Sequence, residues 1–175
     1  EEAELASLPF KSIKLDDLSN FKETSKNWEI AGLAYVNRSK KRTLVAKEGT
    51  GILVNIPKKN HKQNIITNFE HGDIELECDV MMSVGSNSGI YFQSRYKLQL
   101  FDSWGTNLPK YSDMGGIFAR LDKNNEKGEI TLKGQPPYIN AAKAPGLWQH
   151  LKIIFHAPKF DSAGHKIKNA WFEEV

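Results

Sequence analysis

The sequence has a single cysteine, no long hydrophobic run and almost no helical pattern. One cysteine, Cys78, excludes an internal disulfide in a chain of 175 residues. No apolar stretch approaches the ~20 residues that a membrane-spanning helix needs. The net charge is only +3. The two basic clusters, residues 39–42 and 57–62, carry no interleaved aromatic residues, so a nucleic-acid partner is not expected.

What the chain does contain is typical of a globular domain. Hydrophobic residues make up 39% of it and aromatic residues 10%, which is enough to build a core. The length predicts a single domain over residues 1–175. Because the chain ends within an alternating pattern, "NAWFEEV", we expect that one or more closing strands of this domain lie outside the sequence.

Period-two alternation is the main secondary-structure signal. Ile74, Leu76 and Val80 alternate with Glu75 and other acidic residues, which predicts a strand with one apolar face and one acidic face. The segments "WEIAGLAYVN", "GILVNI", "SGIYFQSRYKLQLFDS" and "WQHLKIIFHAP" also look like strands, with glycine and asparagine at the turns between them. Many short strands without helices predict an all-β, antiparallel sandwich or jelly roll.

An acidic row is the first candidate for chemistry. Glu75, Glu77 and Asp79 should project from one strand face, at about 6.5–7 Å between successive side chains. Paired carboxylates supply the acid and the nucleophile or base of glycosidases. The row resembles the Glu-x-Asp-x-Glu motif of laminarinase-type glycoside hydrolases, but departs from it at Glu77 and Asp79. A solvated outer face is the alternative interpretation.

The stretch from residue 85 to 105 is the second candidate. Asn87, Gln99 and Asp102 can exchange paired hydrogen bonds with sugar hydroxyl groups. Tyr91 and Trp104 can offer flat faces to the apolar side of a sugar ring. Turn formation by asparagine and strand termination by aspartate explain some of these residues, but not the whole row.

Other site signatures are weak. The five histidines do not have the spacing of zinc ligands. There is no G-x-S-x-G nucleophile elbow and no phosphate-binding glycine motif. The sequence therefore predicts no cofactor and no metal ligands.

Several segments together resemble the 3-keto-disaccharide hydrolase domain family. The resemblance rests on "GDIELECD", "NSGIY", "RYKLQ" and "DS", followed by "GGIF" and "NAAKAPGLWQ", in the family's order from about Phe10 to Val175. The matching positions are Glu75, Asn87, Ser88, Gly89, Tyr91, Arg95, Tyr96, Gln99, Asp102, Ser103, Asn140, Pro145, Trp148 and Gln149. Two positions depart from the family, which often has Glu where Lys97 stands and Tyr where Phe118 stands.

The resemblance implies a concanavalin A-like jelly roll, exported by a bacterium to the periplasm, the cell surface or the medium. It also implies cleavage of glycosides whose sugar is oxidised at carbon 3, with an oligosaccharide or glycoside as substrate. The ketone acidifies the proton on carbon 2, so a base can remove it and the glycosidic oxygen can leave.

On this basis we predict a carbohydrate-active enzyme with its cleft on a concave sheet face. Glu75 and Asp102 are the predicted catalytic acid or base. The predicted substrate-binding residues are Asn87, Tyr91, Arg95, Gln99, Trp104 and Glu77. A non-catalytic carbohydrate-binding module and a laminarinase-like retaining glycosidase are the alternatives.

Overall fold

The computed structural model describes residues 9–22, 25–121 and 130–175. Within these ranges the chain forms strands and no helix, which confirms the all-β prediction. The strands are β1 (Trp28–Val36), β2 (Leu44–Asn55), β3 (Ile74–Met81), β4 (Asn87–Phe92), β5 (Tyr96–Phe101), β6 (Arg120–Leu121), β7 (Ile130–Leu132), β8 (Trp148–His156), β9 (Lys159–Phe160), β10 (Lys166–Lys168) and β11 (Trp171–Glu174).

The chain divides into two compact units. The first comprises residues 46–69 and the described residues up to 34, and the second comprises residues 35–45 and 70–175. The prediction of one domain over the whole chain stays a prediction. In the first unit β1 and β2 pair closely, because a Cβ on Gly32 would lie 2.8 Å from the Cα atom of Gly49. Glycine at both positions therefore permits the close approach of the two backbones.

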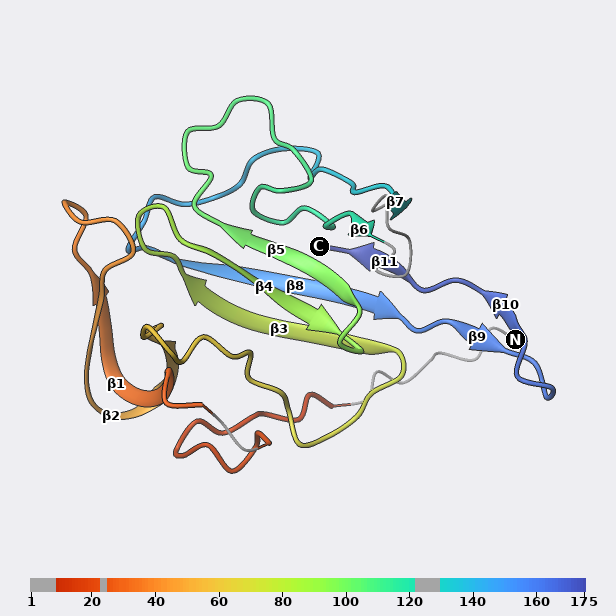
Figure 1. The fold of residues 1–175 in the computed structure, drawn as a ribbon, viewed down its shortest axis with the longest axis horizontal. Coiled ribbons are helices and arrows are strands. Elements are labelled where there is room, and N and C mark those ends of the chain that lie inside the picture. The colour runs from red at the N-terminus through yellow and green to blue at the C-terminus, as the bar shows by residue number, and fades with distance from the viewer. Residues whose placement is uncertain (1–8, 23–24, 122–129) are drawn as a thin grey trace. The chain divides into compact units, whose positions relative to one another are not determined.

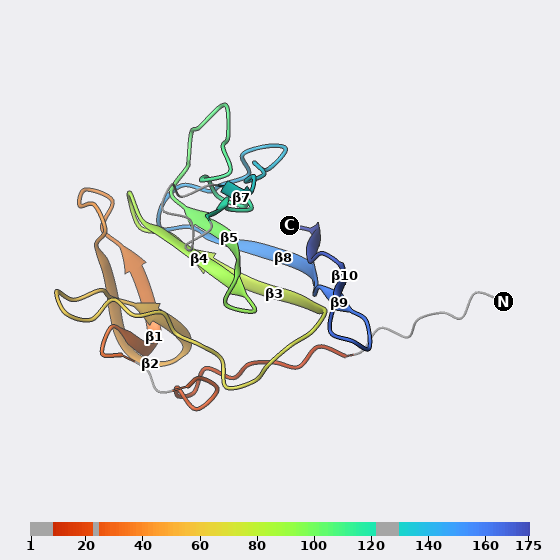
Figure 2. The ribbon, with the colours of Figure 1, turned by 45° about the vertical axis from the view of Figure 1, so that its right-hand side comes forward.

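The second unit contains a three-stranded sheet in the order β11-β8-β3 and a hairpin of β4 and β5. All of these pairings are antiparallel, as predicted. An irregular segment runs beside β5, where Ile117 forms an isolated bridge with Leu98 and another with Gln135. The jelly-roll order of strands stays a prediction. Figures 1 and 2 show the β4–β5 hairpin lying against the β3 and β8 strands.

The core of the second unit lies between the hairpin and the three-stranded sheet. Phe92 and Leu98 come from the hairpin, Ile153 and Phe155 come from β8, and all four are at most 2% exposed. The Phe92 and Phe155 rings stack at 5.0 Å between centroids. Burying each such side chain stabilises the fold by roughly 1.5–3 kcal/mol. Because side chains alternate along a strand, the opposite faces of the hairpin and of the sheet point away from this core.

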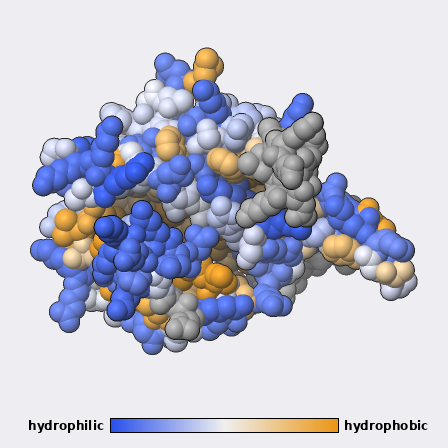
Figure 3. Space-filling view, in the orientation of Figure 1, coloured by the Kyte–Doolittle hydropathy of each residue, from blue (hydrophilic) through white to orange (hydrophobic). Residues whose placement is uncertain are grey.

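The remaining surface is mostly polar. Hydrophilic residues dominate the face drawn in Figure 3, where hydrophobic residues form small, separate patches. Cys78 is a free, half-buried cysteine, and burial raises the pKa of its thiol, as expected for an unreactive side chain. Among the described residues there is no helix long and apolar enough to cross a membrane.

Candidate functional site

Five side-chain positions of the β4–β5 hairpin share the face that points away from the core. In the antiparallel register Gly89 lies opposite Gln99, and Tyr91 lies opposite Lys97. Asn87 is two residues before Gly89 and therefore projects to the same side. We call this surface the hairpin face, and it consists of Asn87, Gly89, Tyr91, Lys97 and Gln99.

Gln99 has an unmatched acceptor at the centre of the hairpin face. Its side chain is fully buried, with 1% of its surface exposed. Its Nε2 donates a hydrogen bond to Oδ1 of Asn87 at 3.2 Å. Its Oε1 accepts no hydrogen bond from the described residues. Because a buried carbonyl oxygen without a donor costs about 1–3 kcal/mol, the hydroxyl group of a ligand would fill a real deficit here.

Lys97 lies beside Gln99 among aromatic rings. Its Nζ is 4.5 Å from the centroid of the Phe118 ring and 6.0 Å from that of Tyr91. Its methylene chain covers Gly89, where an added Cβ would lie 2.4 Å from Cε of Lys97. Desolvation by burial lowers the pKa of Lys97. The geometry therefore favours an amine that loses its proton more easily than a lysine in water.

The acidic row lies on the other side of the core. Ile74 and Leu76 pack against the core cluster, so the acidic residues that alternate with them point outward from β3. Cations of β8 and carboxylates pair across this outer surface. The contacts are Lys152 Nζ to Glu75 Oε1 at 3.5 Å, His150 Nδ1 to Asp79 Oδ1 at 3.0 Å and His150 Nε2 to Glu77 Oε2 at 3.9 Å. The structure thus separates Glu75 and Glu77 from the hairpin face.

Asp102 ends β5 and holds a turn. Its Oδ2 accepts a hydrogen bond from the backbone N–H of Gly85 at 2.8 Å, and its own N–H donates to the carbonyl oxygen of Ser86 at 3.1 Å. Gly85 has a φ of 65°, a conformation that favours glycine. The carboxylate therefore fixes the turn that leads into β4, next to the Asn87 end of the hairpin face.

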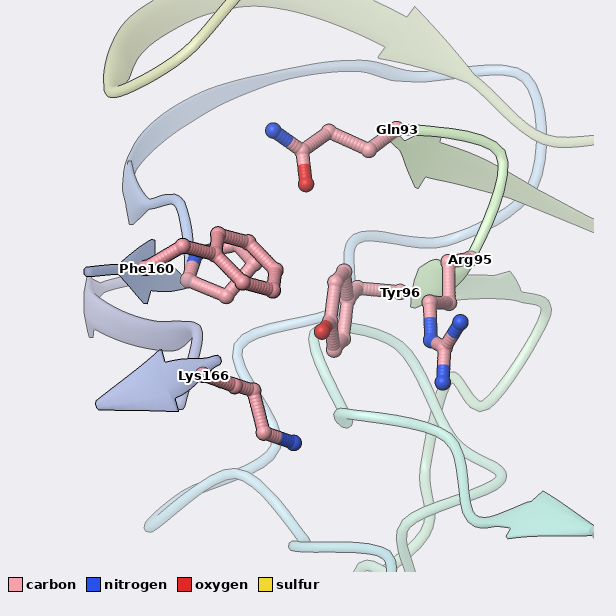
Figure 4. A pocket seen from close by; sticks show the side chains of 6 residues that line it. Gln93, Arg95, Tyr96, Phe160 and Lys166 are labelled. Carbon is pink, nitrogen blue, oxygen red and sulfur yellow. The ribbon is translucent and has the colours of Figure 1, made fainter. Parts of the chain in front are cut away.

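Arg95 lies at the opposite end of the hairpin. Gln93 and Ser94 both have positive φ angles, 52° and 54°, as a tight type I′ turn requires. Beyond this turn is a hollow of about 490 Å³ lined by Gln93, Arg95, Tyr96, Pro158, Phe160 and Lys166. Figure 4 shows the rings of Tyr96 and Phe160 facing one another across it. Arg95 thus lines a separate hollow rather than the hairpin face.

Trp104 lies in the loop after β5 and is 64% exposed. This loop is tied to the segment around Asn140, whose Nδ2 donates to the carbonyl oxygens of Ser103 at 2.7 Å and Thr106 at 3.0 Å. An asparagine that holds two loop carbonyls gives the loop a defined position. Trp104 therefore projects from an anchored loop.

Lys97 and Gly89 are the residues whose importance the sequence analysis missed. The signal was present, because Lys97 is two residues before Gln99 in an alternating strand. In the sequence it stood out only as a departure from the family pattern. No group of three or more histidine, cysteine, aspartate or glutamate side chains in the described part of the chain is arranged to hold a metal ion.

Comparison with known proteins agrees with the resemblance seen in the sequence. Neither a curated protein nor a solved structure matches the chain. The profile of one family, described as the 3-keto-alpha-glucoside-1,2-lyase-like domain, matches residues 15–172. This match covers almost all of the chain and every residue of the hairpin face. It supports a carbohydrate-related role, and the chain belongs to the 3-keto-alpha-glucoside-1,2-lyase-like domain family.

Proposed function

We propose that this protein cleaves the glycosidic bond of 3-keto-glycosides by elimination and binds the oxidised sugar at the hairpin face. The observation that carries the proposal is the buried Oε1 of Gln99, an acceptor without a donor beside the amide of Asn87. Sugar hydroxyl groups are donors of the required kind. Family membership independently supports a sugar substrate.

The chemistry follows from the ketone. A carbonyl at carbon 3 stabilises negative charge on carbon 2, so a base can remove the carbon 2 proton. The electrons of that C–H bond then form a double bond between carbons 1 and 2, while the bond from carbon 1 to the glycosidic oxygen breaks. That oxygen leaves with a proton, and water later adds to the unsaturated sugar.

Residues of the hairpin face have distinct roles in this proposal. Gln99 and Asn87 bind sugar hydroxyl groups, and the exposed ring of Tyr91 packs against the sugar. Trp104 and Arg95 remain predicted substrate-binding residues, which would contact parts of a longer substrate outside the hairpin face. Glu77 likewise stays a predicted binding residue on the opposite outer surface.

The catalytic roles predicted for Glu75 and Asp102 also stay predictions. Asp102 lies next to the Asn87 end of the hairpin face and is only partly buried, so a proton donor at this position is sterically accessible. Glu75 shares its carboxylate with Lys152 on the other side of the core. Export from a bacterial cell and activity without a cofactor are further predictions that follow from the family resemblance and the sequence.

The test is release of an aglycone from a 3-keto-glucoside and from the unoxidised glucoside, each with and without EDTA. We expect release from the keto form alone, at the same rate with EDTA. Gln99→Met should lower kcat/KM at least tenfold, which corresponds to about 1.4 kcal/mol of transition-state stabilisation. Gln135→Met changes an exposed glutamine and is the matched control.

Two other outcomes point to the alternatives. Binding of the keto-glucoside in calorimetry without any release identifies a carbohydrate-binding module. Release from the unoxidised glucoside with retained anomeric configuration identifies a laminarinase-like glycosidase that uses the acidic row, since retention requires a carboxylate pair about 5–5.5 Å apart.

A further inference from the structure

We propose that Lys97 is the base that removes the carbon 2 proton of the 3-keto-glycoside. This inference rests on the proposed function and assigns its central step to a residue outside the predicted catalytic pair. Three features of Lys97 carry it, namely its place on the hairpin face, the packing that fixes its side chain and the chemistry of its surroundings.

The first feature is position. Lys97 and Gln99 project from the same face of β5, two residues apart, which separates their side chains by about 6.5–7 Å. A single sugar ring can reach from one to the other. A sugar held at the unmatched Oε1 of Gln99 therefore presents its neighbouring ring carbons to the amine of Lys97.

The second feature is packing. The methylene chain of Lys97 lies over Gly89 on the paired strand, where any side chain would collide with it. Beyond Gly89 its Nζ lies over the rings of Phe118 and Tyr91. The ring of Phe118 is held in turn by an edge contact with Tyr111 at 5.4 Å between centroids. A flexible side chain placed in this way loses the freedom that normally spreads a lysine amine over many positions.

The third feature is the absence of a carboxylate at the amine. No ion pair to Lys97 forms among the described residues, and the phenol of Tyr91 is the titratable group nearest to it. Lys152 provides the contrast within the same unit. Its Nζ contacts Glu174 at 3.1 Å and Glu75 at 3.5 Å, which raises the pKa of its amine. Burial beside aromatic rings acts in the opposite direction on Lys97 and supplies the neutral form that a base needs.

The proposed step is balanced. The lone pair of the Lys97 amine takes the carbon 2 proton and becomes an ammonium ion. The C–H electrons pass into the bond between carbons 1 and 2 as the glycosidic oxygen departs from carbon 1. The departing oxygen takes a proton from solvent, and the ammonium ion returns its proton to solvent before the next turnover.

The test follows the carbon 2 proton directly. Proton NMR in D₂O measures its exchange in the 3-keto-glucoside, together with release of the aglycone. Wild type should show loss of the carbon 2 signal or release of the aglycone. Lys97→Met should reduce both rates at least 100-fold, in the range typical of lost general-base catalysis, and should still bind the keto-glucoside within fivefold of wild type. Lys110→Met removes an exposed lysine and should have no effect.

A chemical rescue keeps the test independent of misfolding. Lys97→Cys in a Cys78→Ser background, alkylated with bromoethylamine, restores an amine of lower intrinsic pKa at position 97. This variant should regain exchange, with the rise of its pH profile moved to lower pH.

The contrary outcomes are distinct from one another. Exchange in Lys97→Met within threefold of wild type overturns the role of Lys97 and leaves the proposed function intact. A borohydride-stable adduct on Lys97 shows that the amine attacks the ketone, and it also overturns the assignment as a base. No exchange and no release by wild type refutes the proposed function itself, and this inference with it.

Discussion

Replacing His156 with glutamine should destabilise the second unit at about pH 5.5 and have a smaller effect at about pH 9. His156 ends β8 and joins it to the residue before β3 and to β11. Its Nδ1 lies 3.2 Å from Oδ2 of Asp73, and its Nε2 lies 2.6 Å from Oε2 of Glu173. Its ring also stacks on Trp171 at 4.3 Å. Only the protonated imidazolium can donate to both carboxylates at once.

The expected magnitude follows from exposure. A hydrogen bond to a charged group contributes about 1.5–3 kcal/mol when it is shielded from water, and an exposed ion pair about 0.2–1 kcal/mol. The His156 side chain is 26% exposed, whereas Asp73 and Glu173 are 53% and 50% exposed. Solvent therefore screens both pairs, and we expect them to contribute ~1–2 kcal/mol together in the protonated state.

The direction of the pH dependence follows from two pKa shifts. The bond to Glu173, followed by the bond to Asp73, raises the pKa of His156. Its contribution is therefore complete below the unfolded pKa of about 6.5 and is lost as the pH rises through the folded value. The N–H of Ala157 and then His156 lower the pKa of Asp73. That contribution is present above the unfolded pKa of about 3.9 and is lost as the pH falls through the folded value.

The assay is urea unfolding of wild type and His156→Gln, measured across this pH range. His165→Gln is the matched control, because the 80% exposed side chain of His165 pairs with Asp161 in a hairpin loop and should contribute almost nothing. If the stability difference between wild type and His156→Gln stays constant or grows toward about pH 9, the imidazolium does not join these strands and the reasoning is refuted.

Other changes test the core, the hairpin face and the predicted catalytic pair. Phe155→Ala should lower the free energy of unfolding by about 3–5 kcal/mol in urea titration, and a loss below ~1 kcal/mol would contradict the packing described for the core. Gly89→Ala should displace Lys97 and lower kcat on a 3-keto-glucoside at least tenfold while the far-UV circular dichroism stays unchanged, whereas full activity would show that the amine needs no fixed position. Glu75→Gln and Asp102→Asn should each slow release of the aglycone if these residues are the acid and base, and full rates in both would remove them from the catalytic set.

Much of the fold could be predicted because strands reveal their two faces through alternation. The pattern around Glu75 correctly predicted a strand with an acidic outer face, and the pattern from Tyr96 to Phe101 placed Gln99 opposite the apolar residues. Alternation does not reveal which sheet a strand joins. The sequence therefore could not show that Glu75 and Gln99 project from opposite sides of one core.

The contacts made by polar groups were also beyond the sequence. Asp102 could be recognised as a strand-ending carboxylate, but its bond to the N–H of Gly85 depends on a turn 17 residues earlier in the chain. The segment around Ile117 shows no periodic pattern, yet it returns beside β5 and brings Phe118 to Lys97. Such neighbours arise from loop closure, which periodicity does not encode.

The two outer surfaces of the second unit differ in how well their polar groups are matched. On the acidic surface each carboxylate of Glu75, Glu77 and Asp79 has a cationic or ionisable partner on β8, so folding alone accounts for the arrangement. On the hairpin face a buried acceptor of Gln99 has no donor among the described residues, and the amine of Lys97 lies on aromatic rings rather than beside an acid. Both features cost stability in the free protein. A fold does not require such features, but a site that binds hydroxyl groups and moves a proton does, and for this reason we place the chemistry on the hairpin face.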